Sequence, residues 1–386
     1  MIRKAFKYEL FPTKEQIVLI EQHLGSCRFI YNWGLERKIK AYEKKDKVTC
    51  FDLIKELTQL KREKIWLNDV YSQSLQMSIR NLDNGFTKFF KAQTKFPKFK
   101  SKHNSRQSYQ CPQKVKVDFE NNTIQIPMVK KVKAVLHRKF EGIIRTCTIS
   151  KTPTNKYFIS ILVELNQNLP IKPKVLEDTT IGIDLGIKDF YITSNGDKVK
   201  NPKYLRQSEM RLKSIQRRFS RTKKGSKNRI DLRILLAKQY EKVSNQRKDF
   251  LHKLTYELTH ENQVDTICIE NLNVKGMIKN HKLAKSISDA SWSKFVEFLT
   301  YKCDWYGKNL IQIGRFEPSS KICNNCGHYY KELTLEERFW KCSECNEEHN
   351  RDINAAKNIK NFGLITKLED KDISSSINKA SLSDFR

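Results

Sequence analysis

One segment, residues 179–189, most constrains what this chain can fold into. Its sequence is Thr-Thr-Ile-Gly-Ile-Asp-Leu-Gly-Ile-Lys-Asp. Ile181, Ile183 and Leu185 predict a buried strand, and Asp184 lies in its middle with a glycine two residues away on each side. A buried carboxylate is costly unless a cation or a donor meets it. Asp184 is therefore either a core aspartate satisfied by an arginine or a backbone amide, or a metal ligand on a central strand. The choice depends on whether other acids converge on the same place.

Two further acids follow patterns that allow such convergence. Residues 264–270 form a second apolar, strand-like run that ends in Glu270. Asp352 opens a predicted helix with one small apolar face, made of Ala355, Ala356 and Ile359. Small residues let a helix approach a sheet closely. An RNase H-like fold has its first acid on the first strand, its second at the end of the fourth and its third on a late helix, which is the order found here.

Four of the ten cysteines form two Cys-x-x-Cys pairs, separated by fifteen residues: Cys323 with Cys326, and Cys342 with Cys345. This spacing predicts a closed four-thiolate site for one structural zinc ion. Asn346 stands where such a turn usually has glycine, and asparagine tolerates the left-handed conformation. The other six cysteines are scattered, and we expect them to be small buried side chains in a chain that keeps its thiols reduced.

The charge of the chain indicates a polyanionic partner. It has 74 Lys and Arg against 43 Asp and Glu, a net charge of +31 that is spread along 386 residues. A lysine-rich proteome could account for part of this excess. No targeting or membrane-spanning run is visible, so we expect a cytoplasmic protein without a membrane partner. The length predicts two or three domains.

Changes in the spacing of hydrophobic residues along the sequence divide the chain into parts. Residues 1–12 alternate as a strand, and Thr13 with Gln16 forms a capping box before a helical region of roughly 80 residues. Between about residues 108 and 166, hydrophobic residues recur at every second position. This alternation predicts a small β-barrel that the N-terminal strand would join. Asn195-Gly196 predicts a hairpin after the Asp184 strand. From residue 364 the sequence is polar and unpatterned, which predicts a disordered tail.

Two basic stretches are candidate nucleic-acid contacts. The first interleaves aromatic rings with cations over residues 96–106 and includes Lys98, Lys100, Lys102 and Arg106. The second is a basic amphipathic helix that carries Arg247 and Lys248. A plain basic linker and a solvated cationic face are the alternatives. Arg351, adjacent to Asp352, could neutralise a scissile phosphate or form a salt link.

Together these motifs resemble the transposon-encoded TnpB family, compact relatives of the type V CRISPR effector nucleases. The resemblance covers roughly residues 1–363 and includes the three acidic segments, the cysteine pairs and the segments 25–32, 96–102 and 249–253. Asn350 stands where the family often has aspartate, which leaves Asp352 untouched.

The resemblance implies a multidomain α+β protein: a small OB-like β-barrel with an inserted helical domain, then an RNase H-like (RuvC) α/β domain with an inserted four-cysteine zinc module. The expected boundaries are a wedge domain at 1–12 and 103–170, a recognition domain at 13–102, a nuclease domain at 171–319 and 348–363, a zinc module at 320–347 and a tail at 364–386. Asp184, Glu270 and Asp352 take the catalytic positions, where they would hold two Mg²⁺ ions.

The implied function is RNA-guided, Mg²⁺-dependent cleavage of DNA beside a short adjacent motif, in a bacterial or archaeal nucleoid. The implied partners are a guide RNA from the transposon end, double-stranded target DNA and the transposase of the same element. One alternative is an RNA-guided DNA-binding protein or transposition accessory factor that does not cut. Another is an actin-like ATPase, because residues 182–186 also resemble a phosphate loop, but no second glycine-rich loop accompanies them.

Overall fold

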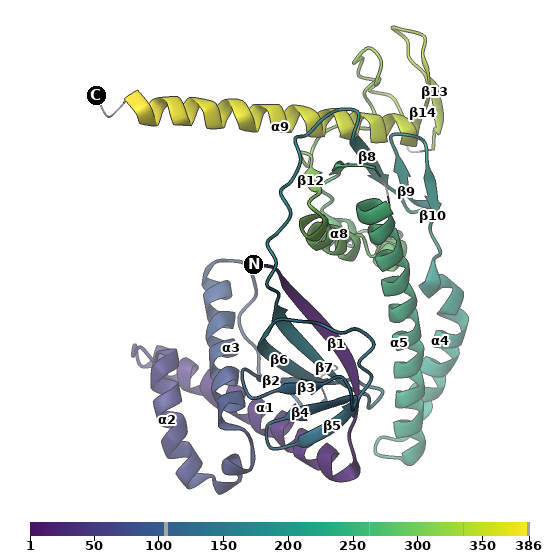
Figure 1. The fold of residues 1–386 in the computed structure, drawn as a ribbon. Helices are drawn as coiled ribbons and strands as arrows, with labels where there is room; N and C mark the ends of the chain where they lie inside the picture. The colour runs from purple at the N-terminus through teal and green to yellow at the C-terminus, as the bar shows by residue number, and fades with distance from the viewer. Residues whose placement is uncertain (104–106, 262, 335, 384–386) are drawn as a thin grey trace. The chain divides into compact units, whose positions relative to one another are not determined.

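The computed structural model describes residues 1–103, 107–261, 263–334 and 336–383, which form two compact units, 1–168 and 169–386. Both units combine helices with a β-sheet, as the ribbon shows (Figure 1). Arg106, one of the expected nucleic-acid contacts, lies outside the described residues. Within the described residues, no helix has the length and apolar character that crossing a bilayer requires.

The first unit contains a seven-stranded antiparallel sheet and a group of helices. The helical elements are α1 (Lys14–Glu43), α2 (Cys50–Glu63), the 3₁₀ helix η1 (Ile65–Asp69) and α3 (Ser72–Phe90). The strands are β1 (Arg3–Phe11), β2 (Gln107–Cys111), β3 (Lys116–Asp118), β4 (Thr123–Ile126), β5 (Lys130–Ala134), β6 (Ile143–Lys151) and β7 (Tyr157–Glu164). Their order in the sheet is β2-β6-β7-β1-β5-β4-β3, so the N-terminal strand joins the later strands as predicted.

The predicted closed barrel is wrong, because the sheet is open: among the described residues β2 and β3 form its two edges and do not pair. The β2 edge is covered by helices instead. Tyr109 of β2 stacks on His23 of α1 with ring centroids 5.0 Å apart, and Asn81 of α3 donates a hydrogen bond of 3.3 Å to Gln110. Strand β3 has only three residues, which limits what it could pair with.

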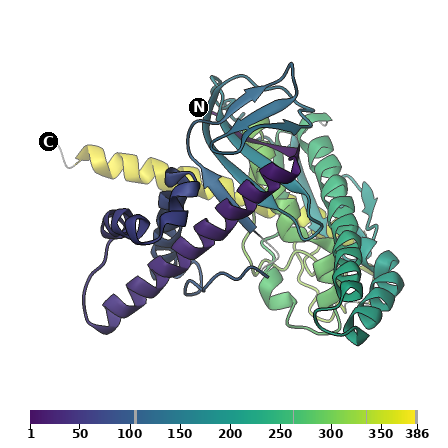
Figure 2. The ribbon, with the colours of Figure 1, turned by 90° about the horizontal axis from the view of Figure 1, so that it is seen from below.

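Helix α1 begins at the predicted capping box, in which Thr13 and Gln16 each accept a hydrogen bond from the other's backbone amide. It runs as one long helix through 30 residues, as the view from below shows (Figure 2). Its first half packs into the sheet core through Ile20 and Leu24, and Leu35 farther along packs against Leu82 of α3.

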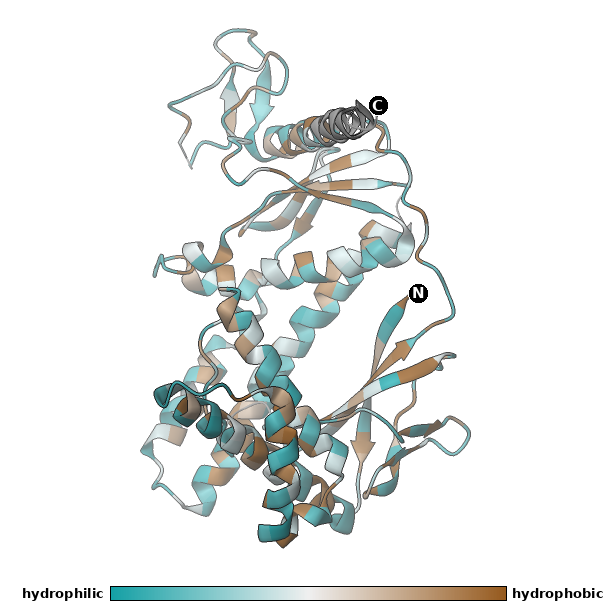
Figure 3. Cartoon of the chain, turned by 90° about the vertical axis from the view of Figure 1, so that its left-hand side faces the viewer, coloured by the Kyte–Doolittle hydropathy of each residue, from teal (hydrophilic) through white to brown (hydrophobic). Residues whose placement is uncertain are grey.

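The second unit is built on a five-stranded sheet of order β10-β9-β8-β11-β12. Its strands are β8 (Thr180–Leu185), β9 (Asp189–Thr193), β10 (Lys198–Lys200), β11 (Thr266–Ile269) and β12 (Asn309–Gln312). Strands β8, β9 and β10 are antiparallel, whereas β11 runs parallel to both β8 and β12. The predicted hairpin is confirmed, and Gly196 in its turn has φ +93°. Hydrophobic residues, brown in Figure 3, concentrate on strands of both sheets.

The helices of this unit cover both faces of its sheet. They are α4 (Tyr204–Arg221), α5 (Lys227–Tyr256), the π-helical η2 (Glu257–Glu261), α6 (Val274–Met277), α7 (Ala284–Ala290), α8 (Trp292–Tyr306) and α9 (Arg351–Ser383). A short hairpin of β13 (Phe339–Lys341) and β14 (Glu348–Asn350) precedes α9. Leu254 of α5 and Phe295 of α8 share a core with Ile183 of β8, whereas α9 packs on β8 and β11.

Helix α9 lies unusually close to the sheet because the facing residues are small. A Cβ at Gly182 of β8 would overlap the carbonyl oxygen of Ala356 and lie 2.6 Å from the backbone nitrogen of Lys360. The helix continues to Ser383, through the region where the sequence pattern predicts a disordered tail. No glycine or proline follows Gly363, so no helix-breaking residue interrupts it.

Candidate active site and metal centre

The sheet of the second unit brings Asp184 and Glu270 to the same edge. Asp184 lies on β8, and Glu270 directly follows β11, whose Ile269 is opposite Ile183 in the parallel pair. Asp352 lies in the first turn of α9, which packs over β8. The three expected catalytic acids therefore come from three different elements that meet at one place.

The pKa of Asp184 indicates that the three acids are close enough to interact, although their donor atoms do not all lie within 4.8 Å of one another. Burial raises the pKa of Asp184, and the nearby carboxylates of Glu270 and then Asp352 raise it further. Arg351 and Arg338 oppose this shift. Burial also raises the pKa of Glu270, while a hydrogen bond of 3.0 Å from the hydroxyl of Ser319 acts in the opposite direction. Mutual repulsion of this kind is relieved when a cation binds between the carboxylates.

Asp352 is held by two arginines. The Nη1 of Arg338 lies 2.8 Å from both of its carboxylate oxygens, and the Nη2 of Arg351 lies 3.3 Å from one of them. Arg351 thus forms the salt link that the sequence left as an alternative to phosphate binding. Arg338 and Ser319 were missed by sequence reasoning, because they lie in loops outside the acidic motifs and only the fold brings them to the site.

The four cysteines of the two pairs converge. In the described part of the chain they form the one group of three or more possible metal ligands whose donor atoms all lie within 4.8 Å of one another. The sulfurs of Cys323 and Cys345 are 3.6 Å apart, as are those of Cys326 and Cys342. A tetrahedral zinc ion with bonds of about 2.3 Å places its sulfurs about 3.8 Å apart, so the arrangement fits such an ion.

Both turns of the cysteine cluster have a residue in the left-handed conformation after the second cysteine. Gly327 has φ +79° and Asn346 has φ +59°, which confirms that asparagine can replace glycine here. Nε2 of His349 lies 3.0 Å from the sulfur of Cys323, and its ring packs on Trp340 at 4.6 Å. His349 has no sequence motif of its own, so only the structure identifies it as a neighbour of the cluster.

The expected nucleic-acid contacts have different surroundings. Lys98, Lys100, Lys102 and Lys248 are all exposed, and Lys100 also places its ammonium 3.8 Å from the centroid of the Tyr31 ring. Arg247 is engaged within the fold, because its Nη2 lies 2.7 Å from Asp289, whose side chain is 6% exposed. Asp289 also accepts hydrogen bonds from the backbone amides of Leu205 and Arg206.

Three sequence families match consecutive parts of the chain. Residues 1–47 match a family described as "Helix-turn-helix domain", 160–281 one described as "Probable transposase" (OrfB_IS605), and 292–359 one described as "Cas12f1-like, TNB domain". The structure of the first part is a strand and one continuous helix. The last match contains the whole cysteine cluster and Asp352.

Relatives match over nearly the whole chain. A protein of Streptomyces pristinaespiralis named "Putative RNA-guided DNA endonuclease" is 36% identical over 371 residues, 94% of this chain and 90% of that protein. The InsQ protein of Escherichia coli K12, named in the same way, is 29% identical. The match covers 92% of this chain and 91% of InsQ. TnpB-like protein L79 of Acanthamoeba polyphaga mimivirus is 29% identical over 49% of this chain and 38% of its own.

A solved structure shares the fold. The Cas12f1 chain in a cryo-EM complex with sgRNA and target DNA aligns with a TM-score of 0.54 and 16% identity, over 93% of this chain and 98% of that one. The fold and site thus define a mixed α/β protein in which acids from a sheet and a neighbouring helix lie near a four-cysteine module. The whole-length relatives make the assignment specific: the chain belongs to the TnpB family.

Proposed function

We propose that this protein is the RNA-guided DNA endonuclease of a transposon, working on DNA in the nucleoid of a bacterium or archaeon. The observation that carries the proposal is the meeting of Asp184, Glu270 and Asp352 from β8, β11 and α9. The sheet order, with β8 central and β11 parallel to it, supports the RNase H-like (RuvC) type that the resemblance implies. The whole-length relatives support guide RNA and target DNA as partners.

The acid cluster fits a divalent-metal site, because buried carboxylates that raise one another's pKa gain from a cation. Asp184, Glu270 and Asp352 would hold two Mg²⁺ ions, which when bound activate water and neutralise the scissile phosphate. Glu270 is oriented by the hydroxyl of Ser319. Arg338 and Arg351 supply positive charge beside Asp352, where a phosphodiester would approach.

The cysteine module would hold one structural zinc ion and would thereby fix the β13–β14 hairpin, which Arg338 directly precedes. In the first unit we assign the open sheet to a wedge domain, residues 1–12 and 103–170, and the helices to a recognition domain, residues 13–102. The nuclease domain would comprise residues 171–319 and 348–363. Lys98, Lys100, Lys102, Arg247 and Lys248 remain candidate nucleic-acid contacts, and the transposase of the same element remains a candidate partner.

The test begins with RNA that co-purifies with Asp184→Ala from cells that carry the native genomic flank. A single structured species with a variable end would supply the guide. Wild-type protein loaded with this RNA should cut matched DNA in Mg²⁺ but not in EDTA. Asp184→Ala, Glu270→Ala and Asp352→Ala should each abolish cutting and keep DNA binding. If the loaded wild-type protein binds its target and never cuts it, the protein is an RNA-guided binding factor instead.

A further inference from the structure

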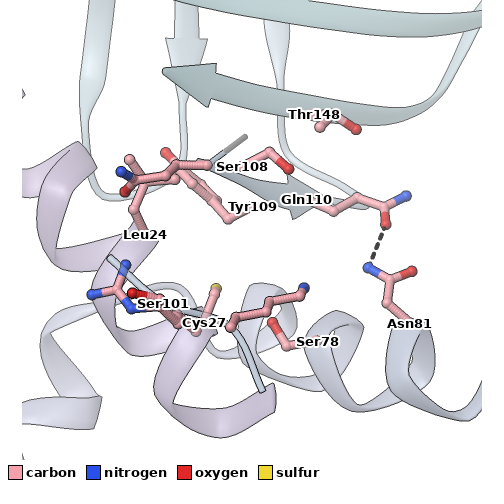
Figure 4. A pocket seen from close by; sticks show the side chains of 12 residues that line it. Leu24, Cys27, Ser78, Asn81, Ser101, Ser108, Tyr109, Gln110 and Thr148 are labelled. Carbon is pink, nitrogen blue, oxygen red and sulfur yellow. Dashed lines mark hydrogen bonds between the residues drawn. The ribbon is translucent and has the colours of Figure 1, made fainter. Parts of the chain in front are cut away.

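A polar pocket in the first unit lies on the side of α1 and α3 that faces strand β2. Its volume is about 270 Å³. The labelled side chains in Figure 4 come from α1, α3, β2, β6 and the segment before β2. Two of the twelve lining residues, Arg28 and Lys100, are cationic, eight carry neutral hydrogen-bonding side chains, and none is acidic. The lining therefore suits an anionic ligand with several hydrogen-bonding groups.

One hydroxyl in this pocket lacks a partner. Tyr109 is only 3% exposed and lines the pocket, and its hydroxyl makes no hydrogen bond to any described residue. An unsatisfied buried hydroxyl destabilises the fold. A ligand that reaches this hydroxyl would complete its hydrogen bonding.

The amides of the pocket are oriented before any ligand binds. Gln110 donates from Nε2 to the hydroxyl of Thr146 at 2.9 Å and accepts from Nδ2 of Asn81 at 3.3 Å, the bond drawn in Figure 4. Because Asn81 uses its nitrogen in this bond, its Oδ1 is available to accept a hydrogen bond. An acceptor held by a neighbouring amide is the kind of group that reads the amino edge of a base.

The cations of the pocket are Arg28 and Lys100, whose ammonium also lies 3.8 Å from the centroid of the Tyr31 ring. Arg28 lines the pocket from α1, and its Nη2 would lie 3.9 Å from a Cβ built on Gly25 of the same helix. Lys100 is held by two hydrogen bonds between its backbone and the Asn32 amide, of 2.8 and 2.9 Å. A guanidinium and an ammonium at one pocket favour a phosphate group.

We propose that this pocket binds one unpaired nucleotide of a nucleic-acid strand, with Arg28 and Lys100 at its phosphate and Asn81 and Tyr109 at its base. The volume is near the lower end of the range for small-ligand sites, about 300–1,000 Å³, so it admits a single nucleotide rather than a base pair. This inference rests on the proposed function, which supplies two sources of the strand, the guide RNA and the target DNA.

The test uses the full chain and the RNA that co-purifies with it. Three variants, Arg28→Gln, Asn81→Leu and Tyr109→Phe, are compared with two controls outside the pocket, Arg80→Gln and Asn84→Leu, which are both exposed on α3. Two affinities are measured by filter binding: that of the free protein for the RNA, and that of the loaded protein for target duplex. Thermal unfolding of each free variant verifies that it is folded.

We expect the three pocket variants to weaken one of the two affinities about tenfold, and the controls to change neither by more than about twofold. Loss of RNA affinity identifies the guide as the source of the nucleotide, and loss of DNA affinity alone identifies the target. Arg28→Gln should also reduce the salt dependence of binding: the slope of the logarithm of the affinity against the logarithm of the salt concentration should fall by about one. Tyr109→Phe should raise the melting temperature of the free protein while weakening binding, a combination that a purely structural tyrosine would not produce.

Unchanged affinities in all three folded variants would overturn the inference. That result is distinct from failure of the proposed function, which is judged by whether the loaded wild-type protein cuts DNA. If the wild-type protein does not cut and the pocket variants still lose RNA affinity, the nucleotide site stands without the nuclease.

Discussion

Arg338 and Asp352 form the contact that joins the cysteine module to the acid cluster. Nη1 of Arg338 lies 2.8 Å from both carboxylate oxygens of Asp352, and the thirteen residues between them form the β13–β14 hairpin with Cys342 and Cys345. The module therefore carries positive charge to the place where the three acids meet. This contact makes the folding of the cysteine module relevant to chemistry on the neighbouring sheet.

Replacing Arg338 should impair cutting more than binding. We expect Arg338→Ala to slow cleavage of target DNA by about a hundredfold, since one cationic group is lost from beside the reacting phosphate. Binding of loaded protein to DNA should change by less than about threefold. Lys341→Ala, an exposed cation on the same hairpin, is the control and should cut at the wild-type rate. If both variants lost cleavage rate equally, the effect would come from the total positive charge of this region and not from the position of Arg338.

Removing one thiolate should empty the cysteine cluster. We expect wild-type protein to contain one zinc ion per chain, measured by atomic emission, and Cys326→Ser to contain none. The melting temperature of the variant should fall, because the binding energy of a structural ion is part of the folding energy. Cys50→Ser, outside the cluster, should keep its zinc. Retention of zinc by Cys326→Ser would show that the cluster is not the binding site.

Adding a methyl group at Gly182 should disrupt the second unit. The Cβ of Gly182→Ala would overlap the backbone of α9, which cannot move as a flexible side chain does. We expect a loss of about 3 kcal/mol or more in the free energy of unfolding, measured by urea denaturation. Gly85→Ala is the matched control, because its Cβ would make only an ordinary contact at 3.7 Å with Pro97. A mild effect at Gly182 would mean that α9 can lie farther from the sheet.

Arg247 and Lys248 are adjacent on α5 and should respond differently to truncation. Arg247→Ala leaves the carboxylate of Asp289 without its cation, and we expect a loss of about 3 kcal/mol in the free energy of unfolding. Lys248→Ala should change stability by less than about 0.5 kcal/mol. Affinity of the folded variants for RNA and DNA is then measured against salt. A reduced salt slope for Lys248→Ala alone would identify it as the nucleic-acid contact of the two.

Because of Glu164, the stability of the first unit should depend on pH in the acidic range. Hydrogen bonds from Arg145 and Arg3 lower the pKa of Glu164 to about 2. Because the pKa is lower in the folded state, this stabilisation is complete above the unfolded value of about 4.3 and is lost as the pH falls toward 2. The difference in melting temperature between wild type and Glu164→Gln should therefore be constant from pH 7 to 5 and shrink below pH 4. A constant difference down to pH 3 would contradict this assignment.

Local patterns determined much of the fold. The capping box at Thr13, the hairpin at Gly196 and the convergence of four cysteines all follow from residues close together in sequence, where backbone geometry leaves few alternatives. Asp184 in one apolar run and Glu270 at the end of another are visible in the sequence, but their role as a catalytic site with Asp352 stays a prediction.

The closed barrel failed as a prediction because alternation of apolar residues shows that strands exist, not which edges pair. Helices α1 and α3 cover β2 through contacts such as that of His23 with Tyr109, between residues 86 positions apart. Charge alone also does not reveal that Arg247 lies beside Asp289, and its contact with nucleic acid stays a prediction.

The sequence by itself therefore determined the strands, the cysteine spacing and the three acids, since each is encoded within a few residues. Only the tertiary structure decided that Arg338, Ser319 and His349 stand beside them, and that Arg28, Asn81 and Tyr109 share a pocket. The physical reason is that contacts between distant residues depend on how elements pack, and packing is set by the shape of the whole core rather than by any single motif.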